Sequence, residues 1–481
     1  MEPGAPRDLE ERIVPSMPTP PSPPAADNSP STDPRQRRRE QRGWYTYDWA
    51  NQVFITSVVT VLIGPYLSGL ACSEAGAGGD CSTPGLTIHP LGFEWFGLHP
   101  NSFHPLVTTV AGLILLVMLP IVGALADHTR HKKRWLLWLA AAGSLCVSSL
   151  YFTDDYRTAA LMFILGNTFY GMSLVVFNAF LPEISTSDER NRVSVTGWAL
   201  AYLGGGLLLA AHMGLLASAE SLGVSEGHAV RIAFASVGVW WLLFSIVGIR
   251  LLRNRYGALA AESGAPRLGA SLKQYWRTLR EMRSFPNTLL FLIAFVLFNN
   301  GIQAVIYFAG SFASQDLGLS LAILSATILL IQFVAFAGAL IMGWIGRRFG
   351  TKNTVLGSLV VWCGLVTCGY YLPPGDPVLF LLLGAGIGMV LGGTQSLARA
   401  LYSLLIPRGR EAEYFSLFQL ADRGSVLLGA ASITLVVNLT GGFRTAIFSL
   451  VIFFIIGGLL LWRADLKAGI EAAGNKVPDN L

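Results

Sequence analysis

Charged residues are scarce in this 481-residue sequence. Asp, Glu, Lys and Arg fill only 13% of the positions, whereas hydrophobic residues fill 52%. The charged share is about half that of an average soluble domain, so the composition argues against a soluble protein. A membrane-spanning helix needs about 20 mostly apolar residues, and the apolar total is enough for about a dozen such helices. We therefore expect an all-α protein that crosses a lipid bilayer several times.

Motifs of enzymes, metal proteins and ATP-driven pumps are also absent from the sequence. No spacing of Cys and His resembles a zinc site, and no GxxxxGK[ST] phosphate-binding loop occurs. No paired carboxylates and no nucleophile with a base converge anywhere. We therefore expect no enzyme, no metal and no other cofactor. The net charge of +5 does not indicate nucleic-acid binding, because the basic residues follow the membrane topology.

The sequence has only five cysteines. Cys146, Cys363 and Cys368 lie inside apolar segments and are expected to be small core residues. Cys72 and Cys81 flank a glycine-rich turn in a predicted external loop. An oxidising compartment would permit a disulfide there, and free thiols are the alternative.

Twelve apolar segments divide the sequence into two sets of six. They fall at about 45–70, 105–126, 135–152, 158–180, 194–217, 229–252, 287–312, 320–345, 354–372, 377–401, 414–439 and 443–463. The proline-rich N-terminal segment has few large apolar residues, and such a composition is typical of disorder. We expect a disordered tail at 1–43, a six-helix bundle at 44–252, a linker at 253–286, a second six-helix bundle at 287–463 and a second tail at 464–481.

Basic residues predict the orientation in the membrane. Three basic residues lie in or beside the predicted outward loops, namely Arg157, Arg231 and Arg444. The basic clusters at 35–42, 130–134, 250–283 and 347–352 fall on the other side of the membrane. Lys and Arg are enriched in cytoplasmic loops. Both termini are therefore predicted to be cytoplasmic. The Ala, Gly and Arg bias and the lack of a targeting address suit a bacterial plasma membrane.

The two halves resemble each other in sequence. Polar residues recur every four positions in the first span, at Asp48, Gln52, Thr56 and Thr60, and a shift of 251 gives the polar set Asn299, Gln303, Tyr307 and Ser311. A shift of 220 carries Gly123 onto Gly343, and Gly204 onto Gly424. Such a parallel duplication of six spans is found in major-facilitator transporters.

Several segments carry a specific family resemblance. GALADHTRHKKR, at 123–134, is similar to the loop signature between the second and third helices of the major facilitator superfamily, although Arg130 replaces its usual second glycine. WYTYDWANQVF at 44–54, FNAFLPEIS at 177–185 and GGTQSLARALYSLLIP at 392–407 resemble the branch of the autophagy-linked vacuolar amino-acid effluxer and its bacterial relatives. The resemblance implies two pseudo-symmetric six-helix bundles, with amino-acid efflux known for fungal members.

A substrate cavity is the main prediction about function. Spans one, four, seven and ten line the central cavity of that superfamily, and in this sequence each carries a polar stripe. The predicted lining is Asp48, Asn51, Gln52, Asn167, Tyr170, Asn299, Asn300, Gln303, Tyr307, Gln395 and Arg399. Arg399 would bind a carboxylate, and Asp48 an ammonium group or a proton. In the alternative interpretation the amides only bridge helices, Asp48 caps a helix or pairs with an arginine, and Arg399 extends to the membrane surface.

Two further charged residues, Asp422 and Arg423, lie about eight residues into span eleven. A charge at the bilayer centre costs about 2.5–3.5 kcal/mol, so the remaining ones usually face a cavity or a partner. We expect Asp422 to offset part of the neighbouring charge, and Arg423 to face the cavity or a carboxylate on another helix.

The loop signature predicts a latch formed by Gly123, Asp127 and Arg130. Gly123 would let two helices approach closely, and Asp127 would accept hydrogen bonds from a helix N-terminus across the boundary between the halves. In the alternative interpretation the basic residues at 130–134 only set the topology.

The sequence as a whole predicts a monomeric secondary transporter for a small polar solute, an amino acid or a related zwitterion or organic acid. The resemblance implies efflux as the direction of transport. The sequence is compatible both with coupling to protons through Asp48 and with uniport. A transporter-like membrane receptor or scaffold that moves nothing is the alternative from another functional class.

Overall fold

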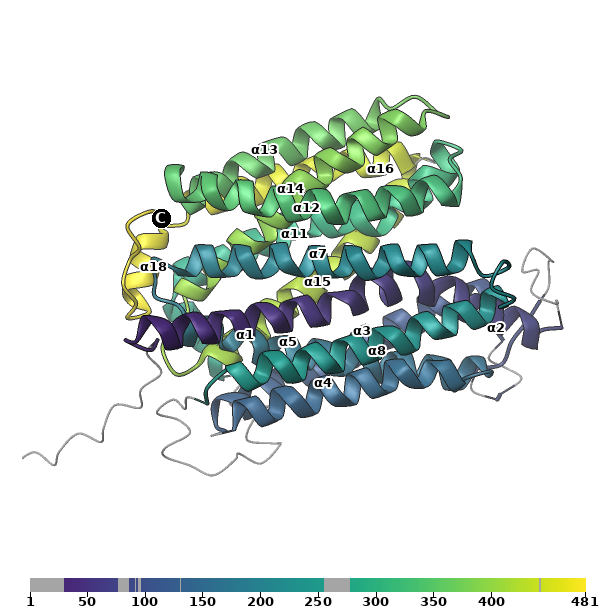
Figure 1. Ribbon diagram of the computed structural model, residues 1–481. Coiled ribbons are helices and arrows are strands. Elements are labelled where there is room, and N and C mark those ends of the chain that lie inside the picture. The colour runs from purple at the N-terminus through teal and green to yellow at the C-terminus, as the bar shows by residue number, and fades with distance from the viewer. Residues whose placement is uncertain are drawn as a thin grey trace, which may run out of the picture.

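The computed structural model describes residues 30–76, 86–90, 92–93, 97–129, 131–254, 277–440 and 443–481. Among these residues, twelve helices are long and apolar enough to cross a membrane. Figure 1 shows them as two bundles, with most of the first half below and most of the second half above. The predicted all-α architecture of two six-helix bundles is confirmed.

The first half starts with one continuous helical segment, in which the α-helices α1 and α2 flank a π-helical stretch, η1. Its elements are α1 (Pro34–Val53), η1 (Phe54–Leu62), α2 (Ile63–Glu74), η2 (Pro100–Ser102), α3 (Phe103–Asp127), α4 (Lys132–Ser149), η3 (Leu150–Phe152), α5 (Tyr156–Ala179), α6 (Leu181–Ile184), α7 (Arg190–Ala217) and α8 (Glu226–Leu251).

The second half repeats the arrangement and adds a short final helix. Its elements are η4 (Met282–Ser284), α11 (Pro286–Ser311), η5 (Phe312–Asp316), α12 (Leu321–Phe349), α13 (Thr351–Tyr370), α14 (Pro377–Leu404), α15 (Glu411–Thr440), α16 (Phe443–Ser449), α17 (Val451–Arg463) and α18 (Leu466–Ala472). We call the end of the molecule that carries α18 and the start of α1 the tail face, and the opposite end the loop face (Figure 1).

The first helix begins earlier than predicted. Asp33 accepts a hydrogen bond from the backbone N–H of Arg35 at 2.9 Å, and Pro34 occupies the first turn, where its missing N–H has no cost. A Cβ atom at Gly43 would lie 2.6 Å from the carbonyl oxygen of Gly248, so this helix packs closely on α8. Residues 34–43 are thus helical rather than disordered. Residues 1–29 lie outside the described residues.

Capping side chains define where helices begin at the loop face. Asp155 accepts from the backbone N–H of Thr158 at 2.8 Å, and Asp376 accepts from the N–H groups of Val378 and Leu379 at 3.0 Å each. These carboxylates pair N–H groups that have no partner within the helix.

The boundary between the halves has the symmetry that a duplication predicts. α3 and α5 of the first half pack against α15 of the second, while α12 and α14 of the second half pack against α7 of the first. A Cβ at Gly123 of α3 would lie 2.7 Å from Ser416 Cβ of α15, and one at Gly343 of α12 would lie 2.6 Å from Val195 of α7. Gly123 and Gly343, one of the two glycine pairs that the shift of 220 relates, therefore sit where helices of opposite halves meet.

Candidate functional site

A polar cavity of about 940 Å³ lies between the two halves. Its walls come from α1, η1, α5 and α7 of the first half and from α11, α14 and α15 of the second. The lining residues with polar, charged or indole side chains are Asp48, Asn51, Gln52, Tyr170, Asn178, Trp198, Asn299, Gln303, Tyr307, Gln395, Arg399, Gln419, Asp422 and Arg423. Tyr307, which also lies in the span 286–310, is 47% exposed.

Asp48 and Arg399 form a buried ion pair that joins the halves through the cavity. Both guanidinium NH groups of Arg399 donate to Asp48 Oδ2, at 3.4 and 3.3 Å, and its Nε donates to Ser194 Oγ at 3.0 Å. Trp44 and Trp198 hold the guanidinium between their rings, with its carbon 4.7 and 5.3 Å from the ring centroids. A buried ion pair is favourable only with such additional partners.

The remaining donors of Arg399 are also used. One NH group donates to the carbonyl oxygen of Ser194 at 2.9 Å, and another reaches Asn178 Oδ1 at 3.4 Å. Arg399 is 4% exposed, so it does not extend to the membrane surface. Asp48 thus both lines the cavity and pairs with an arginine, two of the interpretations that the sequence left open for it.

Asp422 projects from α15 toward two amides of α11. Asn299 Nδ2 and Gln303 Nε2 both donate to Asp422 Oδ1, at 2.9 and 3.1 Å. The neighbouring Arg423 also lines the cavity, and its Nε is buried without a hydrogen-bond partner. Span eleven therefore contributes opposite charges to the same cavity.

The structure brings most of the predicted cavity residues together, but it places two elsewhere. Asn167 lies on α5 three positions before Tyr170, about 4.5 Å along the axis toward the loop face, and does not line the cavity. Asn300 turns toward α15, where its Oδ1 would lie 2.9 Å from a Cβ at Gly429. Adjacent helical residues point in different directions, and on this part of α11 Asn299 lines the cavity whereas Asn300 does not.

Three other lining residues with polar or indole side chains were missing from the predicted set. Asn178 shares the four-residue spacing of the polar stripe on α5, and this spacing could have identified it. Gln419 precedes Arg423 by four positions on α15, which is the same signal. Trp198 is apart from any predicted polar stripe, and only its contact with Arg399 reveals its place at the cavity.

Asp127 makes the contact that the loop signature predicts. Its Oδ1 accepts from the backbone N–H of Ala412 at 2.9 Å, and its Oδ2 accepts from that of Glu413 at 2.8 Å. Both N–H groups belong to the first turn of α15, so the carboxylate caps this helix across the boundary between the halves. Arg130, the third predicted latch residue, lies outside the described residues.

Lys132 adds a buried charge to this region. Its Nζ lies 2.8 Å from Glu183 Oε1 and 3.6 Å from Asp127 Oδ1, and the side chain is only 1% exposed. The ion pair with Glu183 was not predicted, because 51 positions separate the partners in the sequence. Lys132 therefore lies between the carboxylates of Asp127 and Glu183 and helps to hold Asp127 in place.

Cys72 is disulfide-bonded. Cys81, its predicted partner, lies outside the described residues. Cys146, Cys363 and Cys368 are free thiols. Among the residues that the structure describes, no three His, Cys, Asp or Glu side chains form a group that could hold a metal ion.

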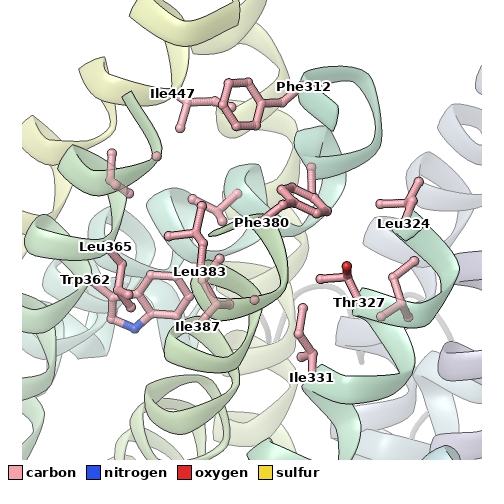
Figure 2. A pocket seen from close by; sticks show the side chains of 16 residues that line it. Phe312, Leu324, Thr327, Ile331, Trp362, Leu365, Phe380, Leu383, Ile387 and Ile447 are labelled. Atoms are coloured by element: carbon pink, nitrogen blue, oxygen red, sulfur yellow. The ribbon is translucent and has the colours of Figure 1, made fainter. Parts of the chain in front are cut away.

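A second cavity, of about 610 Å³, lies within the second half (Figure 2). Phe312, Ile331, Phe380 and Ile447 are among its lining side chains, and nearly all of the others are apolar. The hydroxyl group of Thr327 donates its proton to the carbonyl oxygen of Ile323, which leaves only its oxygen as a possible acceptor. This cavity therefore offers far fewer polar groups than the cavity between the halves.

The family described as "Vacuole effluxer Atg22 like" matches residues 36–474. An uncharacterised MFS-type transporter, YxiO of Bacillus subtilis, is 26% identical over 430 residues, which cover 88% of this chain and 94% of that protein. Autophagy-related protein 22 of Kluyveromyces lactis is 24% identical, with 92% of this chain and 96% of that protein covered.

Solved structures of transporters share the fold. A bacterial homologue of the iron transporter ferroportin, in its outward-facing state, aligns with a TM-score of 0.62 at 13% identity, covering 89% of this chain and 99% of that chain. The proton:xylose symporter XylE aligns with a TM-score of 0.62 at 14% identity, covering 90% of this chain and 98% of that chain. The chain therefore belongs to the Atg22-like vacuole effluxer family within the major facilitator superfamily, and it is a multi-pass membrane transporter rather than an enzyme.

Proposed function

We propose that this protein is a secondary active transporter that exports a small polar solute, an amino acid or a related zwitterion or organic acid. The observation that carries the proposal is the set of four charged residues, Asp48, Arg399, Asp422 and Arg423, around one cavity between the halves. Such groups are costly inside a membrane and usually mark a substrate or ion pathway. Carboxylate, guanidinium and amide groups together complement small solutes that carry charge.

Alternating access is the proposed mechanism, in which the two halves rock around the cavity. In the present structure the Asp48–Arg399 pair and the Asp127 cap both connect the halves. Opening of the tail face would break both contacts. The cap by Asp127 and the close approach at Gly123 thus act as a latch that favours the state closed at the tail face.

Proton coupling through Asp48 is the proposed source of energy. Protonation of Asp48 would neutralise the carboxylate that pairs with Arg399 and so weaken the connection between the halves. Uptake into vesicles with and without a pH gradient tests this step. Equal rates under both conditions would support uniport instead.

The proposed location is the plasma membrane, with both termini in the cytoplasm and the chain acting as a monomer. Basic residues support the orientation: Arg39, Arg134 and Arg348 lie toward the tail face, among many others, whereas Arg157 stands near the loop face. A single chain supplies both walls of the cavity, which supports a monomer. An impermeant thiol reagent should label a cysteine placed at Glu226, on the loop face, from outside intact cells.

A thermal-shift screen of the purified protein against amino acids, peptides and organic acids tests the proposed solute class. A solute that binds the native state raises the apparent stability by mass action. We expect stabilisation by one or more amino acids or organic acids. A receptor or scaffold without transport would be favoured if a solute binds but is not carried into proteoliposomes.

A further inference from the structure

The two arginines of the cavity differ in how many of their donors are free. Arg399 donates to Asp48, Asn178 and Ser194, and two tryptophan rings cover its faces. The side chain of Arg423 makes no ion pair and no hydrogen bond with any residue that the structure describes. Only one of the two guanidinium groups is therefore available to a ligand in this state.

The free guanidinium of Arg423 is unusual for its location. It lies on α15, which the composition identifies as a membrane-spanning helix, and its Nε is buried without an acceptor. A buried donor that has lost water without gaining a partner destabilises the protein. A carboxylate ligand would supply two acceptor oxygens in the geometry that suits a guanidinium group.

The carboxylate of Asp422 likewise has an oxygen atom that is free to bind a cation. Its Oδ1 accepts from Asn299 and Gln303, whereas its Oδ2 has no hydrogen-bond partner among the described residues. The Oδ1 of Asn299 is buried and also lacks a donor. An ammonium group has three donors and no acceptor, so it could serve both of these oxygens.

The two charges on α15 remain apart. No ion pair within 4.0 Å joins Asp422 to Arg423 in the described part of the chain, although they are adjacent in sequence. Successive residues of an α-helix are rotated by about 100°, so their side chains point in different directions. One wall of the cavity thus presents a cation site and an anion site side by side.

We propose that Arg423, rather than Arg399, binds the carboxylate of the solute, and that Asp422 with Asn299 binds its ammonium group. This assignment rests on the proposed transport of a small polar solute and narrows it to zwitterions. The Asp48–Arg399 pair then serves to hold the halves together instead of binding the solute. An organic acid without an amino group would leave Asp422 without a counter-charge.

Binding of matched ligands to purified full-length protein tests the assignment. The probes are the common L-amino acids and, for each one that binds, its N-acetyl derivative and its decarboxylated amine. The wild type should bind the amino acid at least about tenfold more tightly than either derivative, which corresponds to about 1.4 kcal/mol. Arg423→Gln should bind the amino acid no better than the amine, and Asp422→Asn should bind it no better than the N-acetyl derivative. Arg463→Gln, at an exposed position of α17, is the control and should behave as the wild type.

The outcomes separate this assignment from the proposed function. If Arg423→Gln still prefers the amino acid over the amine, the role of Arg423 is wrong while the transported class stands. If Arg423→Lys again prefers the amino acid over the amine, a positive charge at this position binds the carboxylate. If the wild type binds none of the amino acids, their proposed transport is contradicted and the assignment falls with it.

A different observation, at the tail face, carries a second inference. After α18, Asn475 Nδ2 donates to the carbonyl oxygens of Leu404 and Ile406 at 2.9 and 2.7 Å, which fixes the chain to the end of α14. The chain then crosses to the first half. There Lys476 Nζ lies 3.3 Å from Asp188 Oδ2, and the backbone N–H of Asp479 donates to Asp188 Oδ1 at 3.2 Å.

The same segment returns to the second half at the start of α13. The carbonyl oxygen of Asn480 accepts from Thr351 Oγ1 at 3.4 Å, and that of Leu481 accepts from the backbone N–H of Lys352 at 2.8 Å. Residues 475–481, which we call the strap, therefore contact both halves at the face that must open during alternating access. The strap would have to release Asp188 or the second half in each cycle.

We infer that the strap is a built-in brake on opening of the tail face. Lys476 is 70% exposed and Asp188 43% exposed, so their ion pair alone is weak and the brake is modest. The side chain of Asp188 makes both of these contacts between the first half and the strap. In the variant Asp188→Ala the tail face should therefore open several-fold more often. Lys476→Ala removes only the ion pair and should have a smaller effect.

Distances between spin labels at Arg192 of α7 and Asn353 of α13 report this opening. The labels require cysteine substitutions at these exposed positions in a protein whose free cysteines have been replaced. We expect a larger long-distance population in Asp188→Ala than in the unmutated background. Glu226→Ala, at the loop face, is the matched control. Identical distance distributions in Asp188→Ala and in the background would overturn the brake.

Discussion

The carboxylate of Asp127 accepts a hydrogen bond from the backbone N–H of Glu413 at 2.8 Å, and these residues belong to different halves of the transporter. The companion bond to Ala412 N–H is 2.9 Å long. A single side chain of α3 thus caps the helix that carries Asp422 and Arg423 into the cavity. One carboxylate of the first half therefore holds the start of α15 in this structure.

Asp127→Ala should slow transport while protein abundance remains largely unchanged. Loss of a helix cap costs about 0.5–2 kcal/mol, enough to shift a conformational equilibrium without unfolding a large bundle. Uptake rates in proteoliposomes at equal protein content check this. Asp127→Asn keeps one acceptor oxygen and should be intermediate. Unchanged transport in Asp127→Ala would remove the latch hypothesis.

Arg399→Gln should destabilise the protein far more than a change of surface charge. Removal of one partner from a buried ion pair costs about 3–5 kcal/mol, because the remaining charge is left without compensation. Asp48→Asn combined with Arg399→Gln should recover much of this loss. Thermal unfolding of the two single variants and the double variant measures the coupling. Additive effects of the single changes would show that the pair does not act as a unit.

Gly123→Leu should impair folding or transport, whereas Gly112→Leu on the same helix should be tolerated. A Cβ at Gly123 would lie 2.7 Å from Ser416 Cβ, but one at Gly112 would have no neighbour within 4 Å. Inserting side-chain atoms into a packed contact typically costs about 1–3 kcal/mol. Expression level and transport of the two variants give a direct comparison. Equal behaviour would mean that the helices can separate at Gly123 at little cost.

Glu281 near the tail face gives a pH-dependent contribution to stability. The hydrogen bond from Arg410 lowers the pKa of Glu281 below its usual value of 4.5, and burial opposes this shift. A carboxyl group whose pKa is lower in the folded state stabilises the fold above the unfolded pKa, and this stability is lost as the pH falls through the folded pKa.

The melting temperature of wild type should therefore exceed that of Glu281→Gln at neutral pH. The difference should shrink once the pH falls below about 4.5, the usual glutamate value. The effect should be small, because the side chain is 33% exposed. A difference that does not depend on pH would show that the Arg410 hydrogen bond does not act through the charge of Glu281.

Helical spacing was sufficient to predict which faces of α1, α5, α11 and α14 are polar. It placed Asp48, Gln303 and Arg399 at the cavity, and the structure agrees. The periodic signal arises because a costly polar group in a membrane helix must face a cavity or a partner. Gly123 and its repeat Gly343 likewise lie where the halves approach closely, whereas Gly204 and Gly424 do not.

Contacts between distant parts of the sequence could not be predicted in the same way. Spacing gives the polar face of a helix but not the residue opposite it, so the commitment of Arg399 to Asp48 and Ser194 appears only in three dimensions. The same reason explains why the strap's contacts with Asp188 were not foreseen. The helical start at Pro34 was hidden by a composition typical of disorder.

Uptake into proteoliposomes is the most direct test of a transporter built around this cavity. Protein reconstituted without any other component should carry a radiolabelled amino acid that binds it, and an excess of the same unlabelled amino acid inside the vesicles should accelerate the entry. The variant Asp422→Asn combined with Arg423→Gln should lose this exchange while it still folds and inserts. The transporter assignment would be contradicted if the wild-type protein binds the amino acid but uptake is no faster than into vesicles without protein.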